Sequence, residues 1–188
     1  MRRPALAVLL SVLTGIAPAH ESPVDHVERE FRLWVEAGRL HMAYRVQHSE
    51  RSVLMQLRKM DTDNDGIISS DERDSSFTVE SAKLASLFNL ILDGKPLKLV
   101  PSGPVRCDAR LGQTYTFVAD LPVMAPGRHT GRMEDGHARS YPGPFRWLAD
   151  DEKRGRGTVI RPLTPAGERT SALHSASLVL DFEAVVPE

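Results

Sequence analysis

Residues 61–72 constrain the fold of this chain more than any other stretch of its sequence. Aspartates stand at the first, third and fifth positions, a glycine at the sixth and a glutamate at the twelfth. This is the spacing of an EF-hand loop, in which oxygen ligands surround one cation and a helix lies on either side. The sequence therefore predicts a helix-loop-helix around the loop, which reads Asp61-Thr62-Asp63-Asn64-Asp65-Gly66-Ile67-Ile68-Ser69-Ser70-Asp71-Glu72.

The loop offers the ligand set that Ca²⁺ prefers, which is about six to eight oxygens. A glutamate that binds with both oxygens suits Ca²⁺ better than the smaller Mg²⁺, and only a cation relieves the repulsion among four crowded carboxylates. The alternative is a solvated acidic turn without metal. The predicted ligands are Asp61, Asp63, Asp65, the main-chain carbonyl of Ile67, Ser69 and Glu72. Because a single loop is visible and no helix face is rich in methionine, we expect Ca²⁺ to have a mainly structural role.

The segments around the loop predict where the helix-loop-helix is inserted. Apolar residues alternate along 28–36 and again along 40–46, with the turn signal Ala37-Gly38 between them, which predicts a β-hairpin. Ser49 is a helix cap before a run of helical spacing, and Phe77 belongs to a second helix, with an irregular turn expected at 74–76. A second hairpin with an Asp-Gly turn is predicted over 90–100. The insertion thus spans about 49–88, between the second and third strands.

The rest of the chain predicts further strands. Alternating or β-branched runs at 114–118, 145–148 and 177–186 are separated by many glycine and proline breakers. Short strands with frequent turns favour a mainly β fold, an antiparallel Ig-like β-sandwich. The single cysteine, Cys107, lies in an alternating run, so we expect it to be buried as a small apolar residue. We expect residues 20–188 to form one domain.

The first nineteen residues have the pattern of an export signal. Two arginines precede a short apolar run, and Ala17-Pro18-Ala19 is a cleavage site of small residues, so the mature chain would begin at His20 in the periplasm or outside the cell. We expect no transmembrane segment in the mature chain. Without the two arginines, 22 basic residues face 25 acidic ones, and this balance gives no reason to expect nucleic acid as a partner.

The order of these elements resembles a known family. His20-Glu21-Ser22, a hairpin, the helices around the acidic loop, and then Leu92-Asp93-Gly94-Lys95-Pro96 follow one another. This is similar to the periplasmic N-terminal domain that precedes the membrane helices of HupE/UreJ-like proteins, which are related to nickel or cobalt permeases. The resemblance covers about 19–100. It implies at most an accessory role in handling nickel, cobalt or copper, since the sequence to Glu188 has no membrane segment and no nickel-ligand motif to match.

Three functions remain open from the sequence. The first is a calcium-binding module, not an enzyme, that binds an unknown protein or envelope component. The second is the transition-metal accessory, in which His20 as the N-terminal residue chelates copper or nickel with a second histidine. The candidates for that partner are His26, His41, His48, His129, His137 and His174, and His129 and His137 share one loop. The third is an enzyme of unrecognised type, although the sequence contains no known catalytic motif that supports it. Trp34 and Trp147 could belong to a sugar-binding surface, but for both we expect packing in the core or on a sheet face.

Overall fold

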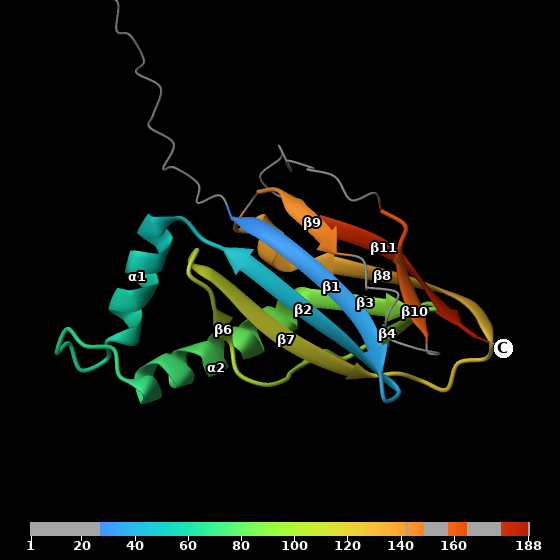
Figure 1. Ribbon diagram of the computed structural model, residues 1–188, viewed down its shortest axis with the longest axis horizontal. Helices are drawn as coiled ribbons and strands as arrows, with labels where there is room; N and C mark the ends of the chain where they lie inside the picture. Colours follow the sequence, from blue (N-terminus) through green and yellow to red (C-terminus); the bar gives the residue numbers. More distant parts are fainter. Residues whose placement is uncertain (1–26, 142, 149–157, 165–177, 188) are drawn as a thin grey trace, which may run out of the picture.

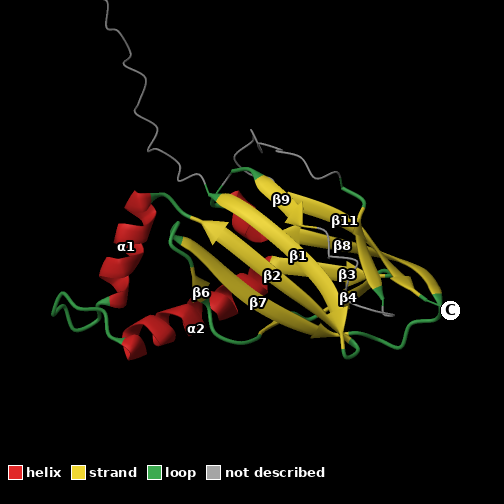
Figure 2. Cartoon of the chain, viewed as in Figure 1, coloured by secondary structure: helices red, strands yellow, loops and turns green. Residues whose placement is uncertain are grey.

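The computed structural model describes residues 27–141, 143–148, 158–164 and 178–187. These residues form two β-sheets that face each other, with two helices at one end of the molecule (Figures 1 and 2). This mainly β, two-sheet architecture confirms the coarse fold class predicted from the sequence. The export signal predicted at 1–19, together with His20, His26 and His174, lies outside the described residues.

Both sheets consist almost entirely of antiparallel pairs. Sheet A has the order β5-β7-β2-β1-β9, with β6 also paired to β7, and sheet B has the order β10-β11-β8-β3-β4. Only β1 and β9 run parallel among the strand pairs of the described residues. The strands of sheet A are β1 (Glu28–Glu36), β2 (Arg39–Gln47), β5 (Val100–Pro101), β6 (Arg106–Cys107), β7 (Gly112–Asp120) and β9 (Phe145–Leu148). The strands of sheet B are β3 (Phe88–Leu92), β4 (Lys95–Leu97), β8 (Gly127–Asp135), β10 (Val159–Pro162) and β11 (Leu178–Val186).

The two predicted hairpins are present, and their turns explain their register. Ala37 and Gly38 both have positive φ, at 49° and 74°, and so do Asp93 and Gly94, at 48° and 74°. Two left-handed residues in succession match the twist of the flanking strands, which fixes β1 against β2 and β3 against β4. The strand predicted up to residue 100 is divided, because β4 ends at Leu97 and β5 joins the other sheet.

One apolar core fills the space between the sheets. The alternation read from the sequence is confirmed, since Phe31 and Leu33 of β1 point inward and are at most 1 % exposed. Aromatic rings from both sheets meet there, with the ring of Phe88 5.1 Å from that of Tyr44 and 5.5 Å from that of Phe117. Trp147 is buried in this core, so its predicted packing role is confirmed.

The two helices lie between β2 and β3 in the chain, as predicted. Helix α1 (Glu50–Met60) begins at Ser49, whose hydroxyl accepts a hydrogen bond from the Ser52 N–H at 3.2 Å. Helix α2 (Ser70–Leu87) is continuous, so the irregular turn expected at 74–76 is wrong. The reason is that a capping box at its first turn starts the helix directly after the acidic loop. Neither helix of the described residues combines the length and the apolar character needed to cross a membrane.

Besides the two-residue strand β6, two strands were not predicted, and their inward-facing residues explain why. In β8 the inward positions are Gly131, Met133 and Asp135, so only one large apolar side chain marks the alternation. The glycine is required by packing, because a Cβ at Gly131 would lie 2.1 Å from the buried ring of Phe182. The other missed strand, β10, has only four residues and a single buried one, Ile160.

Candidate metal site

The acidic loop spans the gap between the two helices. Asp61 caps the end of α1, with its N–H bonded to the Leu57 carbonyl at 3.2 Å, and Ser69 caps the start of α2. The sharp bend between them depends on Asn64 and Gly66, which have positive φ of 60° and 82°. This left-handed backbone is readily adopted by glycine and tolerated by asparagine.

The three aspartates of the loop converge. Asp61, Asp63 and Asp65 each place a carboxylate oxygen within 4.8 Å of the other two. Main-chain N–H groups support them: Asp61 accepts from the N–H of Asp65 at 3.1 Å and from that of Gly66 at 3.0 Å. At this separation each pair of carboxylates still repels by about 1 kcal/mol in water. The cluster therefore has the oxygen donors and the uncompensated negative charge that a hard divalent cation requires.

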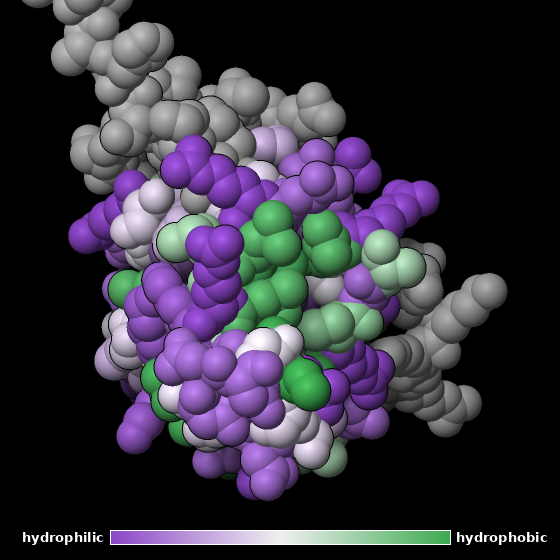
Figure 3. Space-filling model, turned by 90° about the vertical axis from the view of Figure 1, so that its left-hand side faces the viewer, coloured by the Kyte–Doolittle hydropathy of each residue, from purple (hydrophilic) through white to green (hydrophobic). Residues whose placement is uncertain are grey.

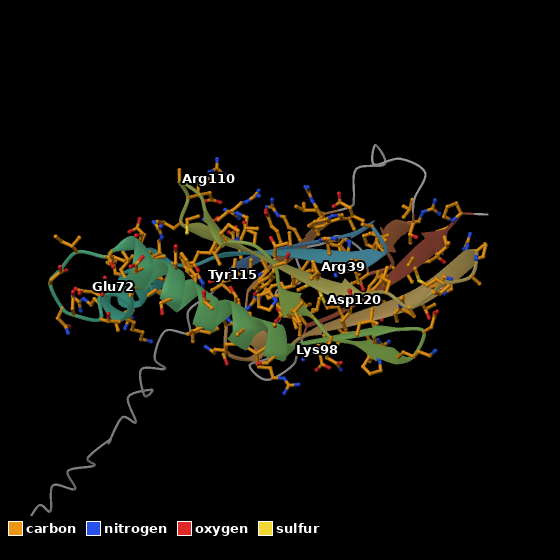
Figure 4. The ribbon with its side chains drawn as sticks, turned by 90° about the horizontal axis from the view of Figure 1, so that it is seen from below. Arg39, Glu72, Lys98, Arg110, Tyr115 and Asp120 are labelled. Carbon is orange, nitrogen blue, oxygen red and sulfur yellow. The ribbon has the colours of Figure 1, made fainter. Side chains whose placement is uncertain are left out.

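Glu72 lies outside this aspartate cluster. One of its oxygens accepts from the N–H and the hydroxyl of Thr62 at 2.7 and 2.8 Å, and the other accepts from the N–H and hydroxyl of Ser69 at 3.0 and 2.9 Å. These hydrogen bonds hold the pKa of Glu72 at about 2, so the carboxylate is charged at neutral pH. Figure 4 shows Glu72 beside the loop at the outer end of the helix pair.

Of the six predicted ligands, the structure thus brings together the three aspartates. Ser69 and Glu72 pair with each other across the start of α2. Ile67 directs its side chain to solvent, where it is 70 % exposed, so only its main chain is available as a ligand. The Glu72 carboxylate bridges Thr62 and Ser69, the second and ninth residues of the loop. The spacing of the twelve-residue pattern does not predict this contact.

The helices connect the loop to the sandwich in different ways. Helix α2 enters the core through Leu84, which is 1 % exposed. Helix α1 is attached by a polar contact, in which the Gln113 side chain donates to that of Gln56 at 2.8 Å. Tyr115, which Figure 4 labels beside α2, in turn donates to Gln113 at 2.7 Å. The loop therefore sits at the outer end of two helices of which only one is anchored in the apolar core.

An apolar groove lies between the helices and the turn that joins β6 to β7. It has a volume of about 330 Å³. Figure 3 shows apolar surface within a polar rim at this end of the molecule. Cys107 lines the groove on the short strand β6 and is exposed, so the prediction that it is buried is wrong. The apolar side chains in the lining include Val53, Leu57, Ile68, Phe77 and Leu111.

The described histidines do not assemble into a metal site. His129 and His137 lie at opposite ends of β8, so the suggestion that they pair is wrong. His129 contacts Asp93 at 2.6 Å and the Ala125 carbonyl at 2.8 Å, and His41 stacks on Trp34. Among the described residues, the aspartates of the loop are the only group of three or more His, Cys, Asp or Glu side chains close enough to share an ion.

A buried polar network is the feature that the sequence analysis missed. Arg29 is 1 % exposed and its Nε lies 3.2 Å from the carboxylate of Asp135, which is fully buried. Arg29 also donates to the Tyr44 hydroxyl at 3.1 Å and to the Tyr141 carbonyl. Burial raises the pKa of Asp135 to about 6, against the opposing effect of Arg29. Sequence offers one signal for this network, an arginine at an inward position of an alternating strand.

His137 extends the network, and burial lowers its pKa to about 3, with a further contribution from Arg29. Its Nδ1 lies 2.9 Å from the Tyr44 hydroxyl. That hydroxyl accepts from Arg29, so it is free to donate its proton to a neutral imidazole. His137 is therefore a neutral residue of the folded protein at physiological pH.

This lowered pKa predicts a specific pH dependence. The stability that His137 contributes is complete above its unfolded-state pKa of about 6.5 and is lost as the pH falls toward 3, because only the unfolded chain takes up the proton. The difference in unfolding free energy between the parent and His137→Gln should shrink by about 1.4 kcal/mol per pH unit below 6.5. Urea unfolding at pH 7, 6 and 5 measures it. A difference that stays constant over this range would contradict a neutral, buried His137.

Comparison of the chain with protein-family models, with curated proteins and with solved structures finds no match.

Proposed function

We propose that this chain is an exported calcium-binding module, an Ig-like β-sandwich whose inserted helix-loop-helix is an EF-hand. The observation that carries the proposal is the convergence of Asp61, Asp63 and Asp65 in a loop whose spacing is that of an EF-hand throughout. Ca²⁺ would be held by these three, the carbonyl of Ile67, Ser69 and Glu72. Export to the periplasm or the cell exterior rests on the N-terminal sequence pattern.

The role proposed for Ca²⁺ is mainly structural. Helix α1 meets the sandwich through the Gln56–Gln113 contact, and its buried Met60 is not part of the core between the sheets, whereas α2 is anchored there by Leu84. An ion between the two helix ends would fix the weakly attached helix to the anchored one. The positive charge of the ion would also offset the repulsion among the carboxylates of the loop.

The protein is proposed to act by contact with another protein or envelope component. The apolar groove beside the loop supports a contact function, because it gathers apolar side chains into one concave surface within a polar rim. Catalysis has no comparable support in the contacts of the described residues. The transition-metal alternative depends on His20, which lies outside the described residues.

Isothermal titration of the purified protein with Ca²⁺ tests the proposal. We expect one ion to bind with a dissociation constant on the order of 10⁻⁴ to 10⁻³ M, as for extracellular modules. Asp61→Ala should weaken this binding by at least about tenfold, because it removes the carboxylate at the first position of the loop, where the pattern allows only aspartate. Failure to bind Ca²⁺, or equal binding by the variant, would contradict the proposal.

The same titration with Cu²⁺ and Ni²⁺ separates the alternative function. Tight binding of either ion that is lost in His20→Ala would move the function to transition-metal handling. We expect no such site.

A further inference from the structure

The outward face of sheet A carries a second hollow, on strands that do not belong to the helix-loop-helix. It has a volume of about 810 Å³. The strand register arranges its side chains in rows across β1, β2 and β7, because residues directly opposite in neighbouring strands share one face. The row through the middle is Arg32, Ala43 and Thr116, and the row beside it is Glu30, Arg45, Thr114 and Arg106.

The side-chain sizes in these rows explain why the sheet is hollow there. Ala43, Thr114 and Thr116 are short and form the floor. Arg32 and Arg106 rise at the two sides, and Trp34 stands at one end. The indole is held in place by stacking on His41, with ring centroids 5.1 Å apart and planes 15° from parallel.

Three arginines, Arg32, Arg45 and Arg106, and two glutamates, Glu30 and Glu36, line the hollow, so the charged side chains of its lining carry one net positive charge. Arg45 has acidic partners, with its guanidinium 2.7 Å from Asp108 and 3.7 Å from Glu30. Glu36 accepts a hydrogen bond from the Trp34 indole at 3.3 Å. By contrast, Arg32 and Arg106 make no ion pair or side-chain hydrogen bond with the residues that the structure describes.

The separation of these two arginines, which have no ion-pair partner among the described residues, indicates the size of a ligand. Arg32 lies on β1 and Arg106 on β6, with β2 and β7 between them. At about 4.8 Å per strand spacing, their main chains are about 14 Å apart across the sheet. Side chains stand roughly perpendicular to a sheet, so the two guanidinium groups lie about as far apart as their main chains. A small anion would then contact one wall, whereas an elongated ligand with more than one negative group can contact both walls and the floor.

The chemistry of the floor and the backbone distinguishes between kinds of elongated anion. The central strands β2 and β1 have neighbours on both sides and β7 pairs with β2, β5 and β6, so their main-chain groups are committed to the sheet. A peptide could extend the sheet only at its edge strands, which include β6 and β9 at the two sides of the hollow, and not across the floor of the hollow. Threonine hydroxyls on the floor and a half-buried indole instead offer hydrogen bonds and an apolar platform for a hydroxylated ring.

We propose that this hollow binds an acidic oligosaccharide. Arg32 and Arg106 bind its carboxylate or sulfate groups, Thr114 and Thr116 hydrogen-bond to ring hydroxyls, and Trp34 packs against the apolar side of one ring. This site is independent of the calcium loop, and its test does not involve Ca²⁺.

Tryptophan fluorescence of the purified protein at low salt, in the presence of a chelator, provides the test. The probes are trigalacturonate and a sulfated heparin disaccharide, and at least one should change the emission and bind in calorimetry. Because Trp147 is 4 % exposed in the core, the emission change should come from Trp34 and vanish in Trp34→Phe. The double variant Arg32→Gln and Arg106→Gln should bind at least about tenfold more weakly.

Arg161→Gln is the matched control, because Arg161 is an exposed arginine on the other sheet. It should bind as the parent does. Neutral maltotriose and the acidic peptide triglutamate should each bind at least about tenfold more weakly than the better acidic saccharide. The proposal is overturned if neither acidic saccharide binds at about 10 mM, if triglutamate binds as tightly, or if Arg161→Gln weakens binding as much as the double variant does.

Discussion

Glu72→Gln is expected to remove most of the thermal response of this protein to Ca²⁺. An ion that binds only the folded state stabilises it by about 2.7 kcal/mol at a concentration one hundred times its dissociation constant. For a chain of this length, that corresponds to a rise in melting temperature of about 5 to 10 °C. The amide has one oxygen and no charge, so it cannot bind the ion through two oxygens, and the rise should fall below about 2 °C.

The comparison of each variant with and without Ca²⁺ is the decisive measurement. Glu72 also accepts hydrogen bonds from Thr62 and Ser69, so the variant should melt earlier even in chelator. Subtracting the melting temperature in chelator from that in Ca²⁺ cancels this loss, because the loss of these hydrogen bonds affects both measurements. A calorimetric scan in Ca²⁺ and another in chelator are therefore needed for each protein.

Asn64→Gly is the matched control within the same loop. Asn64 stands at the fourth position, which supplies no ligand in this pattern, and its positive φ of 60° suits glycine. Its response to Ca²⁺ should equal that of the parent. Equal responses of the two variants, or a parent whose melting temperature ignores both Ca²⁺ and chelator, would show that the loop is not the site described.

Hydrogen exchange should locate the effect of the ion. In chelator, amides of α1 and of the first turns of α2 should lose protection before those of the sheets. The reason is anchorage, since the apolar contact of α2 with the core lies near its far end, at Leu84. This agrees with the sandwich core being formed by residues outside the loop.

The sequence predicted the parts of the fold in which local chemistry and tertiary packing agree. In the hairpin of β1 and β2, the inward positions of β1 include the large apolar residues Phe31 and Leu33, and the turn contains a glycine. Strand β8 is different, because its inward positions serve particular neighbours: Gly131 makes room for Phe182, and Asp135 meets Arg29. Those requirements come from other strands, so no local pattern reveals them.

The candidate site divides in the same way. The spacing of Asp61, Asp63 and Asp65 predicted their convergence, because a loop bent at Gly66 turns them toward one point. The same spacing says nothing about the groups that hold Glu72 between Thr62 and Ser69. The hollow on sheet A was also beyond prediction, since it exists only where the register of four strands is known.

The largest loss of stability is expected from Arg29→Met. This change removes the cation beside Asp135 and leaves a carboxylate that is 0 % exposed without its partner. Breaking a buried ion pair in this way costs about 3 to 5 kcal/mol. Urea unfolding at pH 7.5, followed by the emission of the buried Trp147, measures the loss directly.

Arg39→Met is the matched control, because Arg39 makes an ion pair of nearly the same geometry at the surface. Its Nε lies 3.1 Å from Asp120, compared with 3.2 Å for Arg29 and Asp135, but Arg39 and Asp120 are both exposed (Figure 4). Exposed pairs of this kind contribute less than about 1 kcal/mol. Similar losses of unfolding free energy in the two variants would mean that burial does not account for the contribution of the Arg29–Asp135 pair to stability.

Lowering the pH should restore part of the stability that Arg29→Met loses. This result would distinguish an unpaired buried charge from loss of packing as the cause of the instability. Burial already raises the pKa of Asp135 to about 6, and removal of Arg29 takes away the main influence that lowers it. A carboxyl whose folded-state pKa exceeds its unfolded value gains stability as the pH falls through the folded pKa. The loss of unfolding free energy in Arg29→Met should therefore be smaller at pH 5 than at pH 7.5.

A double variant, Arg29→Met with Asp135→Leu, provides a second test. Its loss of unfolding free energy should be smaller than the sum of the two single losses by about 1 to 3 kcal/mol, because neither charge remains buried alone. Additive losses that do not change with pH would show that Arg29 stabilises the core by packing alone.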